Sequence, residues 1–250
     1  MRHVKDYVTP AVLIVALILI WEIVARVIGM TFILPSPTEV MVKLYDSRNT
    51  LFLVHLPATL AIILIGLAFS IFLGVGLAIW MSVSKAAEKT FYPIVISSQT
   101  IPIIALAPIF VLWFGYSIWS KVVVTLLITF FPITVNTFDG LRSSSKDLKE
   151  LMLTMGASKK DIFFKLSVPS ALPHFYSGLK VAVTLSVIGA AIGEWLGAKA
   201  GLGYFSRRMM TQFDGAGVFA PIVLLSAIGI VLFLIVVLLE KISLKWRRTE

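Results

Sequence analysis

The stretch Leu141–Pro169, which reads LRSSSKDLKELMLTMGASKKDIFFKLSVP, is the one long polar segment that separates apolar stretches of this chain. Ser144 is a residue type that caps helices, and Asp147 follows it at the spacing from which a carboxylate can reach the free backbone N–H groups. The next apolar side chains recur every three or four residues, which places them on one helical face. They are Leu148, Leu151, Met152 and Met155. The pattern predicts an amphipathic helix.

The second half of the stretch repeats this pattern after a break. Gly156 is the residue type that most often ends a helix. Ser158 and Asp161 then form a second start signal, and Pro169 begins the apolar segment that follows. The whole stretch therefore predicts a helix, a glycine turn and a short helix, held at the surface of a membrane.

The composition is that of a membrane protein. Of the 250 residues, 58% are hydrophobic and 14% are charged, whereas soluble domains average about 45–50% and about 25%. The net charge is +9, but the cations lie in short loops, where they orient helices in the membrane rather than bind nucleic acid. There is no cysteine, so disulfides and thiolate metal sites are excluded. We predict an all-α, polytopic membrane protein in a lipid bilayer.

Six apolar segments are long enough to cross the bilayer core, which needs about 20 residues. They predict one transmembrane domain over residues 1–250, with a cytoplasmic loop at 141–168 and spans at about 7–28, 51–83, 91–114, 121–138, 169–198 and 218–242. The third span contains Pro93, Pro102 and Pro108, and a proline removes a helical hydrogen bond and kinks the helix. Because freed carbonyls need partners in lipid, we expect this span inside the bundle, beside any pathway that crosses it.

Polar residues within the apolar spans are candidates for the lining of that pathway. Ser98 and Gln99 belong to a polar patch that either joins helices or lines the pathway. Glu194 is an acid deep in the fifth span, which is a functional-site hypothesis by default. Its alternative role is that of a helix-end carboxylate bonded to local backbone. The candidate pathway residues are Ser98, Gln99, Pro102, Asn136, Glu194 and Trp195.

The distribution of lysine and arginine predicts the orientation of the chain. With the N-terminus inside, the inside segments, which include the polar loop and a basic tail with Arg247 and Arg248, carry about twice as many cations as the outside segments, as the positive-inside rule requires. Six spans then place both termini and the polar loop in the cytoplasm.

The chain lacks the motifs of nucleotide binding and of hydrolysis. There is no G-x-x-x-x-G-K-[ST], the loop that holds nucleotide phosphates, and no Ser-His-Asp or HExxH arrangement. Three histidines on distant segments do not indicate a metal centre. We therefore expect no enzyme activity and no cofactor, and if ATP powers transport, another subunit binds it.

The polar loop resembles the EAA loop of ABC-importer permeases, whose pattern is roughly E-A-A-x3-G-x9-I-x-L-P. Glu150, Gly156 and Pro169 match that spacing, whereas the two alanines of the pattern are here Leu151 and Met152. In that family the loop docks into a groove on a separate ATPase subunit. The resemblance implies that the ATPase-coupling residues are Glu150, Leu151, Met152, Gly156, Ala157 and Pro169.

Two further strings are similar to the same family. Leu34–Pro37 reads LPSP, and Gly193–Gly203 reads GEWLGAKAGLG. Both are similar to permeases of the nitrate, sulfonate, taurine and thiamine-precursor importers, and the GEW form is nearest to the thiamine-precursor members. The substrate that this implies is a small polar metabolite, first a pyrimidine thiamine precursor and second a sulfonate- or nitrate-like anion.

The resemblance also implies an assembly. The chain would be a type I ABC-importer permease in the bacterial inner membrane. It would pair with a second permease chain, expected to be identical. A cytoplasmic ABC ATPase dimer would bind ATP, and an extracytoplasmic substrate-binding protein would deliver the substrate.

The residues by themselves leave alternatives open. The amphipathic loop could lie on lipid headgroups with no protein partner. The chain could be an ion-gradient-driven secondary transporter, a class that usually has internal repeats and intramembrane acids. An intramembrane enzyme or a purely structural subunit is the third alternative, and no nucleophile–base pair supports the enzyme.

Overall fold

The structure is a computed structural model that describes residues 2–245. This part of the chain is helical, with no β-strand in it. It forms two compact units. The first unit comprises the described part of Met1–Thr59 together with Ala200–Leu225, and the second comprises Leu60–Lys199 with the described part of Ser226–Glu250. Arg247 and Arg248 of the predicted basic tail lie outside the described residues.

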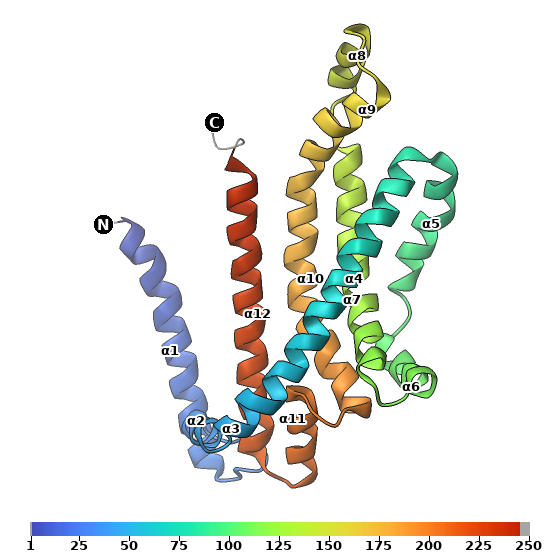
Figure 1. The fold of residues 1–250 in the computed structure, drawn as a ribbon. Coiled ribbons are helices and arrows are strands. Elements are labelled where there is room, and N and C mark those ends of the chain that lie inside the picture. Colours follow the sequence, from blue (N-terminus) through green and yellow to red (C-terminus); the bar gives the residue numbers. More distant parts are fainter. Residues whose placement is uncertain (1, 246–250) are drawn as a thin grey trace. The chain divides into compact units, whose positions relative to one another are not determined.

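The first unit contains one long helix, α1, and several short elements (Figure 1). The elements are α1 (Arg2–Ile28), α2 (Pro37–Asp46), α3 (Arg48–Thr50), the π-helical segment η1 (Leu51–His55) and α11 (Leu202–Thr211). Two longer helices, α4 (Leu56–Val83) and α12 (Gly215–Ser243), each contribute residues to both units.

The LPSP string forms the start of α2. Ser36 is the N-cap residue, and its hydroxyl accepts a hydrogen bond from the backbone N–H of Glu39. The Glu39 carboxylate accepts in return from the N–H of Ser36, at 2.8 Å. This reciprocal capping box satisfies two N–H groups that a helix start leaves free, and Pro37 needs no partner in the first turn.

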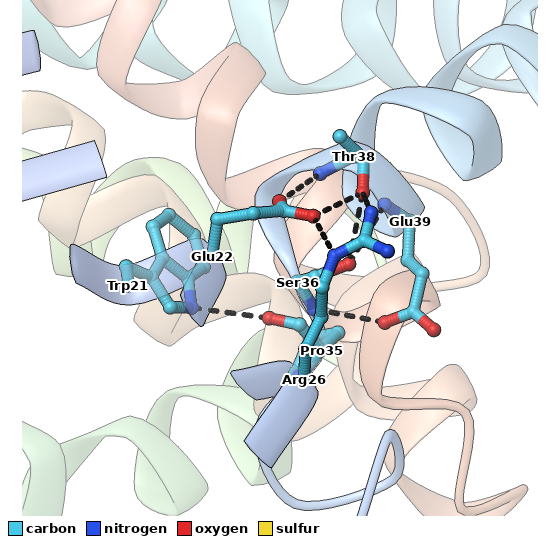
Figure 2. A network of polar contacts seen from close by, with 7 residues as sticks. All are labelled: Trp21, Glu22, Arg26, Pro35, Ser36, Thr38 and Glu39. Carbon is cyan, nitrogen blue, oxygen red and sulfur yellow. Dashed lines mark hydrogen bonds and ion pairs between the residues drawn. The ribbon is translucent and has the colours of Figure 1, made fainter. Parts of the chain in front are cut away.

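Side chains of α1 reach the same turn (Figure 2). One oxygen of Glu22 accepts from the backbone N–H of Thr38 at 3.1 Å, and the other accepts from the Thr38 hydroxyl at 2.8 Å. Trp21 donates its ring N–H to the carbonyl of Pro35 at 3.0 Å. Arg26 forms an ion pair of 2.6 Å with Glu22, as their spacing on one helix predicts. The turn at the start of α2 is therefore stabilised by its own capping box and by side chains of α1.

Two more contacts join the N-terminal segment of the first unit to its segment Ala200–Leu225. The Nδ1 atom of His55 accepts from the N–H of Gly201 at 3.0 Å, which joins the end of η1 to the N-cap residue of α11. Lys43 pairs with Asp214 at 2.6 Å. Burial alone would raise the pKa of Asp214, but hydrogen bonds from Lys43 and from the N–H of Gly217 outweigh it and hold that pKa below its usual value.

The second unit is organised around α7 and α10, which lie side by side (Figure 1). Besides parts of α4 and α12, its elements are α5 (Lys85–Ser98), α6 (Ile103–Phe114), α7 (Ile118–Arg142), α8 (Lys146–Thr154), α9 (Lys159–Ile162), η2 (Phe163–Ser167) and α10 (Val168–Gly197). The short helices α8 and α9 project beyond the ends of α7 and α10 (Figure 1).

A close contact, here called the α7–α10 seam, joins these two helices along Lys121–Asn136 and Gly178–Gly197. A Cβ atom at Gly178 would lie 2.5 Å from the carbonyl oxygen of Pro132 and 2.8 Å from the Cβ of Asn136. Only glycine permits this approach, as is common between helices in membranes. The side-chain amide of Asn136 donates to the carbonyl of Pro132 at 2.8 Å.

The predicted fold class is confirmed. Among the described residues, four helical stretches are long and apolar enough to cross a membrane, and the bent pair α5 and α6 makes a fifth if it counts as one span. The four are Arg48–Val83, Ile118–Arg142, Lys159–Gly197 and Gly215–Ser243. The number of six spans and the single domain over 1–250 stay predictions.

The span predicted over 91–114 is not one kinked helix. It consists of parts of α5 and α6, which are bent by 101° at a break over residues 99–102, here called the elbow. Pro102 stands at the N-cap of α6, and a proline disfavours helical conformation at the preceding residue, Ile101. Pro93 and Pro108, by contrast, lie inside α5 and α6. One proline of the three therefore divides the span.

Candidate functional site: the loop between α7 and α10

The polar loop 141–168 folds into the predicted helix, glycine turn and short helix. Its first helix, α8, has no buried residue along Lys146–Thr154. Leu148, Leu151 and Met155 expose 49%, 55% and 78% of their surface. Because water disfavours exposed apolar groups, a row of them on one short helix is typical of a surface that a partner covers.

The start of α8 differs from the prediction. Ser145, not Ser144, is the N-cap residue, and its side chain makes no capping hydrogen bond. The hydroxyl of Ser144 is buried and has no hydrogen-bond partner within the described structure. The physical reason is the length of α7, which runs to Arg142, so that Ser144 lies within the turn and α8 begins one residue later.

The end of α8 is a Schellman motif at Gly156. The N–H of Ala157 donates to the carbonyl of Met152 at 2.9 Å, and the N–H of Gly156 donates to that of Leu153 at 3.0 Å. Gly156 has a φ of 82°, and this left-handed conformation costs other residues about 1–2 kcal/mol. No atom lies within 4 Å of the position that a Cβ would take. The backbone conformation, not the available space, therefore requires glycine here.

The second helix of the loop is continuous with a membrane span. Ser158 caps α9 in a capping box with Asp161, as predicted, and Asp161 also pairs with Lys165 at 2.7 Å. The segment then passes through η2 into α10, with Pro169 in the first turn of α10. Because Lys159–Gly197 is one helical stretch, a displacement of α9 is passed directly to α10.

The predicted coupling residues lie mostly together. Glu150 and Leu151 are exposed on α8, while Met152 and Ala157 are half-buried. Gly156 forms the turn between α8 and α9, and Pro169 lies apart from the others, on α10. Their contact with an ATPase stays a prediction.

The predicted pathway residues lie in three separate places. Ser98, Gln99 and Pro102 lie at or beside the elbow, where Gln99 and Pro102 are exposed, and the hydroxyl of Ser98 donates to the carbonyl of Val95 at 2.7 Å. Asn136 lies in the α7–α10 seam. A role in lining the pathway stays a prediction for all of them.

Glu194 and Trp195 lie at the far end of α10 and differ in exposure. Trp195 is 46% exposed, whereas Glu194 is 1% exposed. A buried cation, Lys121, interacts electrostatically with Glu194. Lys121 is the first residue of the predicted span 121–138, and the sequence does not indicate this interaction, because only the packing of α7 on α10 brings the two charges near each other.

Lys121 holds the start of α7 to the end of α10. Its ammonium group donates to the carbonyls of Ser117 at 2.8 Å, Tyr116 at 3.0 Å and Gly197. These bonds satisfy the carbonyl of Gly197 at the last turn of α10, where a helix leaves carbonyls free. The GEWLGA string therefore contains the end of the α7–α10 seam.

Comparison with known proteins supports the resemblance. A family model described as binding-protein-dependent transport system inner membrane component matches residues 70–242. The chain is 57% identical, over the full length of both chains, to the formylaminopyrimidine transport permease protein ThiX of Halalkalibacterium halodurans. It is 31% identical to the riboflavin transport system permease protein RibX of Chloroflexus aurantiacus, over 98% of this chain and 94% of the relative. The nitrate import permease protein NrtB of Synechocystis sp. is 24% identical, over 79% of this chain and 75% of the relative.

These matches exclude two of the alternatives. Permeases of this family are not enzymes and carry no cofactor, and ATP is bound by a separate ATPase subunit. The family implies an ATPase and a substrate-binding protein as partners, and a multi-pass location in the inner membrane. An ion-gradient-driven transporter and an intramembrane enzyme do not fit this family. The chain therefore belongs to the family of binding-protein-dependent transport system inner membrane components, the permeases of ABC importers.

Proposed function

We propose that this permease carries a formylaminopyrimidine, a pyrimidine precursor of thiamine, into the cell. The observation that carries the proposal is the 57% identity, over both full lengths, to a permease named for that substrate. The relatives named for riboflavin and nitrate are 31% and 24% identical. A sulfonate- or nitrate-like anion is the second candidate, because further relatives are named for aliphatic sulfonates and nitrate.

The predicted pathway residues are compatible with this substrate class. Ser98, Gln99 and Asn136 are uncharged hydrogen-bonding groups, and such groups suit a formylamino group and ring nitrogens. We propose that they line the pathway together with Pro102 and Trp195.

The experiment is transport by the purified assembly. The permease is reconstituted into liposomes with its ATPase and its binding protein, and the uptake of labelled formylaminopyrimidine, riboflavin and nitrate is compared with and without ATP. We expect ATP-dependent uptake of the formylaminopyrimidine alone. Preferential uptake of either other compound would refute the proposed substrate.

We propose that α8 couples the permease to the ATPase. The support is the exposed apolar face of Leu148, Leu151 and Met155, since burial of one such side chain contributes about 1.5–3 kcal/mol. Glu150 lies beside this face on α8. ATP binding would draw the two ATPase subunits together and move the two loops of the permease dimer. Transport then requires that the ATPase bind one permease conformation better than the other.

We also propose that both termini and the polar loop lie in the cytoplasm. The absence of cysteine from the chain makes single-cysteine labelling free of background. In intact spheroplasts, an impermeant maleimide should label Arg48→Cys, on the predicted outside, and should label Lys160→Cys only after permeabilisation. The reverse pattern would contradict the orientation.

The pairing of two identical permease chains is the remaining part of the proposed assembly. The dimer is expected from the family, in which two permeases form one pathway. The mass of the detergent-solubilised complex should correspond to two copies of this chain with two ATPase subunits. A complex that contains a different second permease would contradict the homodimer.

A further inference from the structure

The base of α5 is joined to the end of α7 by two contacts that lie one helical turn apart. Arg142, the last residue of α7, donates from its guanidinium group to the carboxylate of Glu88 in the first turn of α5. One turn further in, the rings of Phe138 on α7 and Tyr92 on α5 have centroids 5.4 Å apart. The Arg142 guanidinium also lies 5.3 Å from the centroid of the Phe138 ring. Two residues of each helix, spaced by four, therefore face each other.

The two contacts differ in burial. Phe138 is 1% exposed and packs with Ala78, Met81 and Ala87 in a hydrophobic core. The side chains of Arg142 and Glu88 are 57% and 32% exposed. An ion pair with this exposure contributes little to folding, because water screens the two charges. The buried core contact therefore contributes more to the stability of the α5–α7 packing than the ion pair does.

The helix α5 lies between two interruptions. Ser84, with non-helical backbone angles of −130° and 112°, separates it from α4. The elbow separates it from α6 with a bend of 101°. A helix with a break at each end can tilt through changes in a few backbone angles, which is how hinged elements move. Ser98 and Gln99, predicted to line the pathway, lie where such a tilt would have its effect.

We infer that the Arg142–Glu88 ion pair is the link through which movement of the polar loop reaches α5 and, through it, the elbow. This inference rests on the proposed docking of α8 on the ATPase. Because α8 begins four residues after Arg142, a displacement of α8 acts on Arg142 through a short segment. It is a second route beside the continuous helix Lys159–Gly197. Arg142 and Glu88 are positioning residues, which touch neither substrate nor ATP.

The test measures movement at the elbow itself. Thr100 is exposed there, and because the chain has no cysteine, Thr100→Cys introduces a single thiol. In the purified complex with its ATPase, the rate of maleimide labelling is measured without nucleotide and with ATP plus vanadate. We expect the two rates to differ about threefold, as for a shift between two conformations. In Arg142→Glu and in Glu88→Gln, the ratio of the two rates should fall to one.

Two controls separate the link from other effects of these residues. The double variant Arg142→Glu/Glu88→Arg restores a pair of opposite charges, and it should recover most of the labelling ratio. Lys165→Gln removes an exposed ion pair with Asp161 in the same loop without a change at α5, and it should leave the ratio unchanged. Melting temperatures of all variants should stay close to that of the starting protein, because exposed pairs contribute little to stability.

Several outcomes would overturn the link. They are an unchanged ratio in Arg142→Glu and Glu88→Gln, a charge exchange that recovers nothing while the ATPase stays bound, and no nucleotide effect at the elbow in the starting complex. Loss of the ATPase from Arg142→Glu alone would assign Arg142 to docking and also overturn it. Failure of the unsubstituted permease to bind an ATPase would instead contradict the proposed docking.

Discussion

The α7–α10 seam and the polar loop differ in whether their side chains find partners within the chain. In the seam, the buried Lys121 donates to three backbone carbonyls and interacts with the buried Glu194. In the loop, Leu151 and Met155 leave more than half of their surface exposed. The seam is thus complete within one chain, whereas the apolar face of α8 is of the kind that a second protein covers. Substitutions in the seam should change folding, and substitutions in the loop should change coupling.

The largest effect is expected from Lys121→Met. The substitution removes the buried ammonium group, so the Gly197 carbonyl loses a hydrogen-bond donor and the buried Glu194 loses a nearby opposite charge. Removing one partner of a buried charge pair destabilises the fold by about 3–5 kcal/mol. The melting temperature of the detergent-solubilised permease should fall by several degrees or the folded protein should be lost, while exposed Lys89→Met should have no effect. Equal melting temperatures for the two variants would show that the seam does not depend on the cation.

Gly178→Leu should have the next largest effect. Its Cβ would lie 2.5 Å from the carbonyl oxygen of Pro132, so α10 must move away from α7, at a cost of about 1–3 kcal/mol. Gly76→Leu on α4 is the matched control, since no atom lies within 4 Å of its Cβ position. Fluorescence-detected size-exclusion chromatography after heating should show loss of the folded-protein peak for Gly178→Leu and not for Gly76→Leu. Comparable loss of both variants would attribute the effect to helix glycines in general.

Leu151→Ala tests the loop. Its side chain is 55% exposed, so the permease alone should keep its melting temperature. Loss of about 1.5 kcal/mol of apolar burial should weaken ATPase binding about tenfold, as measured by titration of the ATPase onto the permease in nanodiscs. Leu112→Ala, at an 83% exposed position of α6, should bind the ATPase normally. Unchanged affinity in Leu151→Ala would favour a loop that lies on lipid headgroups.

Gly156→Val should change the free energy by about as much as Leu151→Ala. The φ of 82° disfavours a β-branched residue by about 1–2 kcal/mol, so the turn after α8 should be lost in part of the molecules. Uptake per ATP hydrolysed should fall, because hydrolysis becomes uncoupled from movement of the spans. Gly156→Asn should retain coupling, since asparagine adopts this conformation more readily. Full uptake in the valine variant would count against the docking role of the loop.

Local signals predicted the loop well and the third span poorly. Gly156 and the pair Ser158 and Asp161 act on backbone groups within four residues, so their effects could be read from the sequence. The three prolines of the third span have the same local chemistry, yet only Pro102 divides the helix. Which proline does so depends on the packing of α5 and α6, and no local pattern contains that information.

Contacts between distant residues were not predictable. Lys121 and Gly197 are 76 residues apart in the chain, and Glu88 and Arg142 are 54 apart. Periodicity reveals which side of a helix is apolar, but it does not reveal the helix that the side faces. The sequence signal for Lys121 was a lysine at the start of an otherwise apolar span, and this also fits a cation at the membrane surface.

The sequence alone determined that this chain is a helical membrane protein with one amphipathic loop between spans. The physical reason is that lipid offers backbone groups no partner, so each apolar segment must satisfy its own hydrogen bonds as a helix. Only the tertiary structure decided that Lys121 and Glu194 are buried in the same seam and interact electrostatically, that the third span bends by 101° and that Arg142 reaches Glu88. These features depend on how helices approach one another, and close packing is a property of the assembled unit rather than of any one segment.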